Sequence, residues 1–266
     1  MGLAIDTIVG HAVNPGAAVT GVTMAAGDSA SIRSFNPPAS AKIERIVRAG
    51  GTAGLVQVRS PLMHDMTRGI RFTSSEDPLV VALPLETGQL VNSQDTLTIE
   101  LTGGAAETDL AILSLYYQNL QGGSARLHSW GDIAGLIVNI KPVEVDCVAS
   151  AAIGTWTDTA LNVTENLLKA NTDYAVLGYV TDVEVAYVAV KGQDTSNLRI
   201  GGPGKVDSDE TSDLFVFWGN REGTPHIPVI NAANAGSTFV SVVDDEASTA
   251  VKVQLVLAQL SQNLPN

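Results

Sequence analysis

The residues best suited to catalysis or metal binding, histidine and cysteine, are few in this chain and are not spaced for a shared site. No two of the four histidines are two or four positions apart, the spacing that places two imidazoles on one face of a strand or helix; they are His11, His64, His128 and His226. Cys147 is the single cysteine, and its Val145 and Val148 neighbours predict a small buried packing residue rather than a nucleophile. We therefore predict no catalytic, cofactor-binding or metal-binding residue, with His64 or His226 as a metal ligand the alternative.

Two acidic groups are the candidates for binding a cation. One comprises Asp207, Asp209 and Glu210, and the other is the run Asp244-Asp245-Glu246. Calcium takes six to eight oxygen ligands, which such side chains can supply. Neither group matches the twelve-residue calcium loop with its central Gly and terminal Glu. We expect solvated hairpin tips, and calcium binding at either group stays open.

Glycine-rich and aromatic residues offer two further kinds of site. A phosphate cradle needs glycines between a strand and a helix. Gly50-Gly51 and Gly201-Gly202-Pro203-Gly204 do not have that context, so both predict turns. The aromatic residues that could form a sugar platform are Trp130, Trp156, Trp218, Tyr116 and Tyr117. Because aromatic residues are only 5% of the chain, packing in the core is the better prediction for them.

Composition excludes several classes of partner. The formal net charge is −13 and no basic run exists, which argues against direct nucleic-acid binding because affinity for phosphates comes from Lys and Arg. Apolar residues make up 45% of the chain and charged residues 16%, so we expect much of the surface to contact other protein. No apolar run approaches the roughly 18 residues of a membrane span, and residues 1–6 lack a signal-peptide pattern. These features predict a soluble protein made in a cytoplasm.

The chain reads as two similar β-rich halves. The apolar strand Asp109 to Leu120 closes the first half, and Ala250 to Leu260 closes the chain in the same way. Upstream, Ile70-Arg71-Phe72 aligns with Leu198-Arg199-Ile200. The second half is longer between these anchors, which we interpret as a loop elaboration around residues 207–210 and an aromatic strand, Leu214 to Trp218.

Short strands at roughly 8 to 12 residue spacing, with Gly, Pro, Asn and Asp turns, predict an all-β fold of two tandem jelly-roll or β-sandwich domains with little helix. The predicted limits are 1–120 for the first domain, with a short extended arm at its start, 121–132 for a linker and 133–266 for the second domain. Within the first 38 residues we expect strands at Ala4 to Val9 and Ala18 to Met24. Thr164 to Lys169 is the one short helix expected.

This tandem, acidic, motif-poor architecture resembles the double jelly-roll major capsid proteins of tailless icosahedral phages and viruses. The resemblance covers nearly the whole chain in architecture and involves no specific motif. It implies a homotrimer with a pseudo-hexagonal footprint that tiles a shell, often over an internal membrane that the chain would not span. The short, non-basic N-terminal arm departs from that pattern.

The function expected from this resemblance is structural and not enzymatic. The chain would be a major capsid protein located in the virion and made in the host cytoplasm. Its partners would be copies of itself and other virion proteins, without direct contact to nucleic acid. Two alternatives remain open: another virion component such as a decoration, tail or spike protein, and a cupin-like or carbohydrate-active β-sandwich enzyme.

Overall fold

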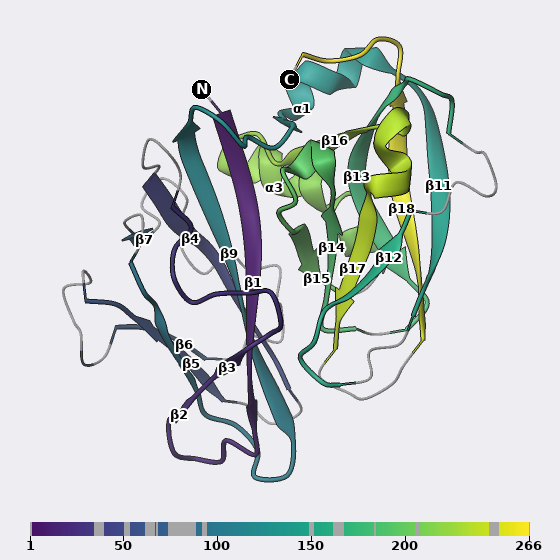
Figure 1. The fold of residues 1–266 in the computed structure, drawn as a ribbon. Helices are drawn as coiled ribbons and strands as arrows, with labels where there is room; N and C mark the ends of the chain where they lie inside the picture. The colour runs from purple at the N-terminus through teal and green to yellow at the C-terminus, as the bar shows by residue number, and fades with distance from the viewer. Residues whose placement is uncertain are drawn as a thin grey trace. The chain divides into compact units, whose positions relative to one another are not determined.

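The computed structural model describes residues 2–34, 40–50, 54–61, 67, 69–73, 89–91, 95–148, 152–161, 168–183, 185–205, 208–244 and 250–265. The chain forms two compact units (Figure 1). Unit 1 comprises Met1–Gly122 with Ser150–Trp156 and Val243–Ser248, and unit 2 comprises Gly123–Ala149, Thr157–Val242 and Thr249–Asn266. The domain limits given above stay a prediction, whereas the mostly antiparallel β-sandwich architecture is confirmed.

Unit 1 contains a five-stranded and a four-stranded sheet. The larger sheet has the order β3-β1-β9-β4-β7, with β1 Gly2–Val13, β3 Thr23–Met24, β4 Ser40–Ala49, β7 Gln89–Val91 and β9 Thr108–Leu120. The smaller sheet has the order β2-β8-β5-β6, with β2 Thr20–Gly21, β5 Leu55–Arg59, β6 Ile70–Thr73 and β8 Thr98–Leu101. The expected extended arm is wrong, because residues 2–13 form a largely buried strand paired with β9 along its length.

Unit 2 also contains a five-stranded and a four-stranded sheet. The larger sheet has the order β10-β16-β13-β18-β11, with β10 Leu127–His128, β11 Ile137–Cys147, β13 Asp173–Thr181, β16 Ile227–Asn231 and β18 Val251–Leu260. The smaller sheet has the order β12-β17-β14-β15, with β12 Thr157–Ala160, β14 Tyr187–Lys191, β15 Ile200–Pro203 and β17 Phe239–Val243. The predicted strands that close each half are therefore confirmed as β9 and β18.

The two units share one strand order. Each unit has eight strands when β2 and β3 are counted as one interrupted second strand and β10 is counted as an addition in unit 2. Numbered along the chain within each unit, strands one, eight, three and six are neighbours in that order in one sheet. Strands two, seven, four and five are neighbours in that order in the other sheet. This two-sheet, eight-strand arrangement is the jelly roll. In both units the last strand lies between the first and the third, so the apolar segments β9 and β18 occupy interior positions of their sheets.

All the helices among the described residues lie in unit 2. They are α1 Trp130–Ile133, η1 Ala134–Leu136, η3 Gln193–Thr195, α2 Ser208–Thr211, α3 Leu214–Glu222 and η4 Ala232–Ser237. Ser129 caps α1 through a capping box with Asp132. The predicted helix at Thr164 to Lys169 falls mostly outside the described residues. No described helix has the length and apolar character needed to cross a membrane.

The segment Leu214 to Trp218 was predicted as a strand and is instead the start of α3. Four of these five residues are buried, and the fifth, Phe217, is 43% exposed. Phe215 makes edge-on ring contacts with Tyr179 and Trp218, with ring centroids 6.4 Å and 6.1 Å apart. A short apolar run does not distinguish a strand from a buried helix by periodicity, which accounts for the wrong prediction.

The predicted turn at residues 201–204 is also wrong, since Gly201 and Gly202 belong to strand β15. A Cβ on Gly202 would lie 2.3 Å from Cδ2 of Leu214 and 2.8 Å from the hydroxyl of Tyr179. A Cβ on Gly201 would lie 2.0 Å from the carbonyl oxygen of Val188. Glycine is needed at both positions because neighbouring elements pack too closely for a side chain, and not because the chain turns there.

Each smaller sheet carries a polar cluster that includes the arginines aligned from the sequence. In unit 1, Arg71 on β6 donates from Nε to Gln57 Oε1 at 2.9 Å, and Arg59 Nη2 lies 2.8 Å from Glu100 Oε1. In unit 2, Arg199 lies just before β15 with Nη2 3.5 Å from Asp158 Oδ1. Arg71 is the second residue of the fifth strand of unit 1 and Arg199 immediately precedes the fifth strand of unit 2, so the aligned arginines lie near the start of the same strand in both units.

Candidate functional site

The histidines and acidic residues considered above do not form a metal site in the part of the chain that the structure describes. His226 is buried, and its Nδ1 lies 3.0 Å from the carbonyl oxygen of Thr224. His11 lies on β1 of unit 1, His128 lies on β10 of unit 2, and His64 is outside the described residues. No group of three or more His, Cys, Asp or Glu side chains among the described residues could hold a metal ion.

The acidic residues that the structure describes differ from the expected solvated hairpin tips. Asp209 and Glu210 lie in the short helix α2 rather than in a hairpin, and Asp207 is outside the described residues. Asp244 is 9% exposed, and its carbonyl oxygen accepts a hydrogen bond from Gly154 N–H at 2.9 Å within unit 1. Its neighbours Asp245 and Glu246 are also outside the described residues, so calcium binding at these groups remains untested.

Cys147 and four of the five aromatic candidates are packing residues, as predicted, whereas Trp130 is half-buried. Four of the five aromatic candidates are buried, namely Tyr116, Tyr117, Trp156 and Trp218. Cys147 is 3% exposed on β11, and burial raises the pKa of its thiol to about 11. The thiol is therefore protonated near neutral pH and is a poor nucleophile.

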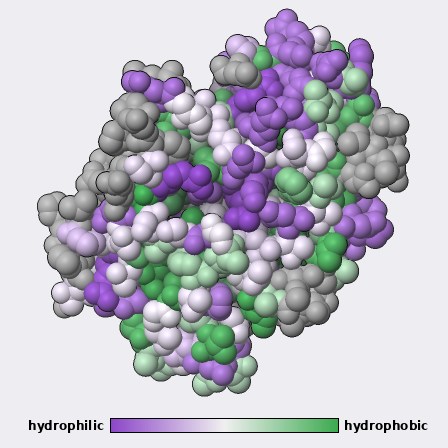
Figure 2. Space-filling model, viewed as in Figure 1, coloured by the Kyte–Doolittle hydropathy of each residue, from purple (hydrophilic) through white to green (hydrophobic). Residues whose placement is uncertain are grey.

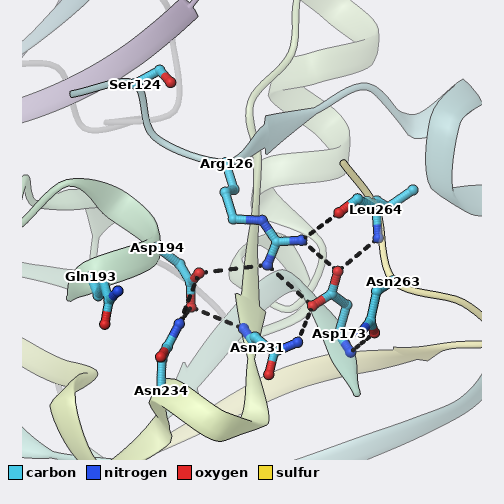
Figure 3. Close-up of a pocket in the computed structure, with 9 residues that line it drawn as sticks. All are labelled: Ser124, Arg126, Asp173, Gln193, Asp194, Asn231, Asn234, Asn263 and Leu264. Atoms are coloured by element: carbon cyan, nitrogen blue, oxygen red, sulfur yellow. Dashed lines mark hydrogen bonds and ion pairs between the residues drawn. The ribbon is translucent and has the colours of Figure 1, made fainter. Parts of the chain in front are cut away.

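The candidate site that the structure reveals is a polar pocket of about 420 Å³ in unit 2 (Figure 3). Its lining residues come from segments far apart in the sequence: Ser124, Arg126, Asp173, Gln193, Asp194, Asn231, Asn234, Asn263 and Leu264. Asp173 is the first residue of β13 and Asn231 the last residue of β16, while Asp194 lies in η3 and Asn234 in η4. The pocket therefore forms at one end of the jelly roll, where strand ends and loops meet.

A buried ion pair forms the base of this pocket. The Arg126 guanidinium makes a two-point contact with the Asp173 carboxylate, with Nη1 donating to Oδ1 at 3.1 Å and Nη2 donating to Oδ2. The side chains are 9% and 0% exposed, respectively. Arg126 Nη1 also lies 3.5 Å from Asp194 Oδ1, so one cation faces two carboxylates.

The same pair holds the segment that follows β18. The backbone N–H of Leu264 donates to Asp173 Oδ2 at 2.8 Å, and the carbonyl oxygen of Leu264 accepts from Arg126 Nη2 at 3.0 Å. The Asp173 N–H donates to Asn263 Oδ1 at 3.1 Å. Both backbone polar groups of Leu264 are thus satisfied by one buried side-chain pair, which fixes residues 263–264 on the unit.

The Asp194 carboxylate is held mainly by neutral donors. It accepts from the backbone N–H of Asn231 at 2.9 Å and from the side-chain amide of Asn234 at 3.1 Å and 3.2 Å. Asn231 also donates from its side chain to Asp173 Oδ1 at 2.7 Å. Asn231 therefore links the two carboxylates, and the pocket is one connected hydrogen-bond network.

The electrostatics of the pocket favour binding over proton transfer. Burial alone would raise the pKa of Asp173, but hydrogen bonds from Arg126, the Leu264 N–H and Asn231 lower it below its ordinary value. Burial and the charge of Arg126 lower the pKa of the neighbouring His128. A general acid or base works best with a pKa near the working pH. An ionised Asp173 is instead a fixed acceptor.

Comparisons with known proteins give little. No protein-family model matches the chain, and no curated protein matches it. Among solved structures the chain is similar to the cryo-EM structure of a T=1 Penaeus vannamei nodavirus, with 12% sequence identity and a TM-score of 0.25, over 98% of this chain and 99% of that one. At that TM-score the similarity adds nothing to the fold described above.

Proposed function

We propose that this chain is a structural virion protein, a major capsid protein that assembles as homotrimers into an icosahedral shell. The observation that carries the proposal is the duplicated jelly roll, with the same strand order in both units of one chain. Jelly rolls are a common architecture of viral capsid proteins, although they also occur in lectins and cupins. Because each chain contains two units with the same topology, a trimer would contain six similar jelly rolls.

Exposed apolar side chains on strand β11 also support self-association. Val138 and Ile140 on β11 are 58% and 47% exposed, Val148 just after the strand is 65% exposed, and among the described strands β11 pairs only with β18. Pro142 lies in the same strand. Figure 2 shows apolar residues in small groups between polar ones on the face in view. Larger contiguous apolar patches mark protein interfaces, so the support for self-association is confined to the exposed residues at β11.

The partners proposed are copies of the chain and other virion proteins, with no direct contact to nucleic acid. The net charge of −13 would repel the phosphates of a genome. An internal membrane beneath the shell is compatible with the proposal, and the chain would not span it. The proposed location is the virion, after synthesis in the host cytoplasm.

Negative-stain imaging and light scattering of the purified protein test the proposal. The expected result is a trimer or larger assembly at micromolar concentration, with closed shells under assembly conditions. Trimers that never form shells but attach to a pre-formed lattice would indicate a decorating virion protein instead. A compact monomer at micromolar concentration would contradict both.

A further inference from the structure

Part of the second half of the chain packs within unit 1. Unit 1 includes Ser150–Trp156, from the connection between β11 and β12, and Val243–Ser248, from the end of β17 and its connection to β18. β12 and β17 are paired with Thr157 opposite Val242, so the two connections begin at adjacent strand ends. We call residues 152–156, the described part of the first connection, the strap.

Trp156, the last residue of the strap, is joined to β1 through Asp28. Its indole Nε1 donates to Asp28 Oδ2 at 2.8 Å, and the same oxygen accepts from the backbone N–H of Val9 at 2.8 Å. Asp28 closes a turn in which its N–H donates to the carbonyl oxygen of Ala25 at 2.9 Å and Gly27 has a φ of +88°. The indole N–H of a buried tryptophan usually has a hydrogen-bond partner. Trp156 is 8% exposed, and its partner is a carboxylate that also binds the first strand of unit 1.

The backbone of the strap lies directly against β1 at Gly154. A Cβ on Gly154 would lie 2.8 Å from Cβ of His11 and 2.9 Å from its Nδ1, and Gly154 has a φ of +67°. Glycine is therefore needed here both for the close approach and for the backbone conformation. The Gly154 N–H donates to the carbonyl oxygen of Asp244 at 2.9 Å, which joins the strap to the second connection.

The strap lies beside the point where the pairing of β3 with β1 stops. β3 pairs with β1 only at Gly10 and His11, although β1 is 12 residues long. At the next residue, the carbonyl oxygen of Val9 accepts from Ala25 N–H at 2.9 Å and its N–H donates to Asp28. Strand edges without a partner can pair with other chains, and native proteins usually cover them. The turn at residues 25–28 and the strap supply that cover where β3 ends.

The strap therefore has its contacts in one half of the chain and its origin in the other. Its contacts are with β1 and with the turn at residues 25–28, within the first 28 residues. It continues directly into β12, more than 30 residues after β9, the last strand of unit 1. The first 122 residues thus lack a buried tryptophan that the packing of unit 1 includes.

We propose that the strap is a structural element that unit 1 requires, contributed by the second half of the chain through Trp156 and Gly154. Unit 1 then reaches its full stability only after residues beyond its own last strand have docked on β1. The strap fixes β1 through the carboxylate of Asp28. The proposal does not depend on the virion function above.

Hydrogen exchange of the full chain, measured by mass spectrometry, tests the proposal. Trp156→Phe keeps an aromatic ring and removes the N–H that Asp28 accepts. Because hydrogen bonds to charged groups are among the stronger ones, peptides from residues 2–13 and 25–28 should exchange about tenfold faster. Trp156→Ala should give a larger increase, while peptides from β13 and β16 keep their protection. Phe217→Ala, at an exposed aromatic residue of α3, is the matched control and should leave the exchange of residues 2–13 unchanged.

Trp156→Phe guards against misfolding, because an apolar ring still fills the site. Unchanged exchange of residues 2–13 in Trp156→Phe would overturn the proposal. So would faster exchange confined to β11, β12 and β17, because Trp156 would then stabilise only the strands next to it in sequence. Faster exchange spread evenly over both units in Trp156→Phe would likewise contradict a specific role in unit 1.

Discussion

At the scale of single residues, the clearest feature of this protein is one arginine that binds two carboxylates and a backbone carbonyl group. Arg126 contacts Asp173, Asp194 and the Leu264 carbonyl oxygen, and its side chain is 9% exposed. Burial of charges costs free energy, which only complete pairing recovers. The cluster therefore acts as a unit, and removing one member leaves the others buried without compensation.

Asp173→Asn should destabilise unit 2 strongly. The substitution leaves the Arg126 charge without its closest counter-ion and weakens the hold on Leu264, which should lower the free energy of unfolding by about 3 to 5 kcal/mol. Urea denaturation followed by circular dichroism would measure it. Glu144→Gln, which removes an exposed partner of Lys252, is the control and should cause no measurable change. An equal effect of the two substitutions would contradict the role given to Asp173.

The same residue predicts how stability changes with pH. The pKa of Asp173 is lower in the folded protein than in the unfolded chain, so its ionised form stabilises the fold. That contribution is complete above the unfolded value of about 3.9 and is lost as the pH falls through the folded pKa. Unfolding free energies measured between about pH 6 and pH 2.5 should therefore fall less steeply in Asp173→Asn than in the unmodified chain. Parallel curves would show that Asp173 is not ionised in the folded state.

The sequence did not predict this cluster. Its members Arg126, Asp173, Asp194 and Asn231 lie on four segments that only the jelly-roll connections bring together. None belongs to a local motif, and each taken alone is an ordinary polar residue at a strand end or in a short connection. By contrast, the packing role of Cys147 could be predicted because its immediate neighbours carry the information.

At the scale of elements, helix α3 shows where strand prediction reaches its limit. Its residues Leu214 to Trp218 have the composition of a buried strand, and the decisive information lies elsewhere, in the glycines of β15. Gly202 leaves room for Leu214 and Trp218, whose atoms lie within 3 Å of the position a Cβ would take. The packing of α3 against β15 depends on residues of both elements, so the sequence of either segment alone does not predict it. The strands β9 and β18 were predictable because long apolar runs with β-branched and aromatic residues need no such partner.

Gly202→Ala should displace α3 from β15. The added methyl group would meet Leu214 at 2.3 Å, and overpacking of this kind costs about 1 to 3 kcal/mol. The intrinsic tryptophan fluorescence, to which Trp218 contributes, and the near-ultraviolet circular dichroism should change together with the melting temperature. Gly236→Ala in η4, where no atom lies within 4 Å of the new methyl group, should leave all three measurements unchanged. A Gly202→Ala protein with unaltered stability would show that the contact is not tight in solution.

At the scale of the whole molecule, the repeat visible in the sequence corresponds to a repeated topology. The correspondence of Arg71 with Arg199, and of β9 with β18, follows from two units with one strand order. The additional length predicted in the second half is present as α2 and α3 between the fifth and sixth strands of unit 2. The sequence predicted that an elaboration exists but not that it is helical.

Self-association should increase with salt concentration. Copies that each carry a formal charge of −13 repel one another, and salt shortens the range of that repulsion from about 10 Å at 0.1 M to about 3 Å at 1 M. Sedimentation velocity across this range should show larger assemblies at higher salt concentration. The same trend is expected on lowering the pH towards the sequence isoelectric point of about 4.5. Assemblies that dissociate in salt would show that ion pairs between copies, rather than apolar contacts, hold the interface.

The place of β9 and β18 in their sheets also governs how the polypeptide acquires its structure during synthesis. In each unit the last strand to be synthesised fills an interior position of the larger sheet, between the first and third strands, which cannot complete their pairing before it arrives. Contacts so distant in sequence make folding slow. Each nascent half therefore keeps unpaired strand edges until Leu120 or Leu260 emerges, and such edges can pair with other chains.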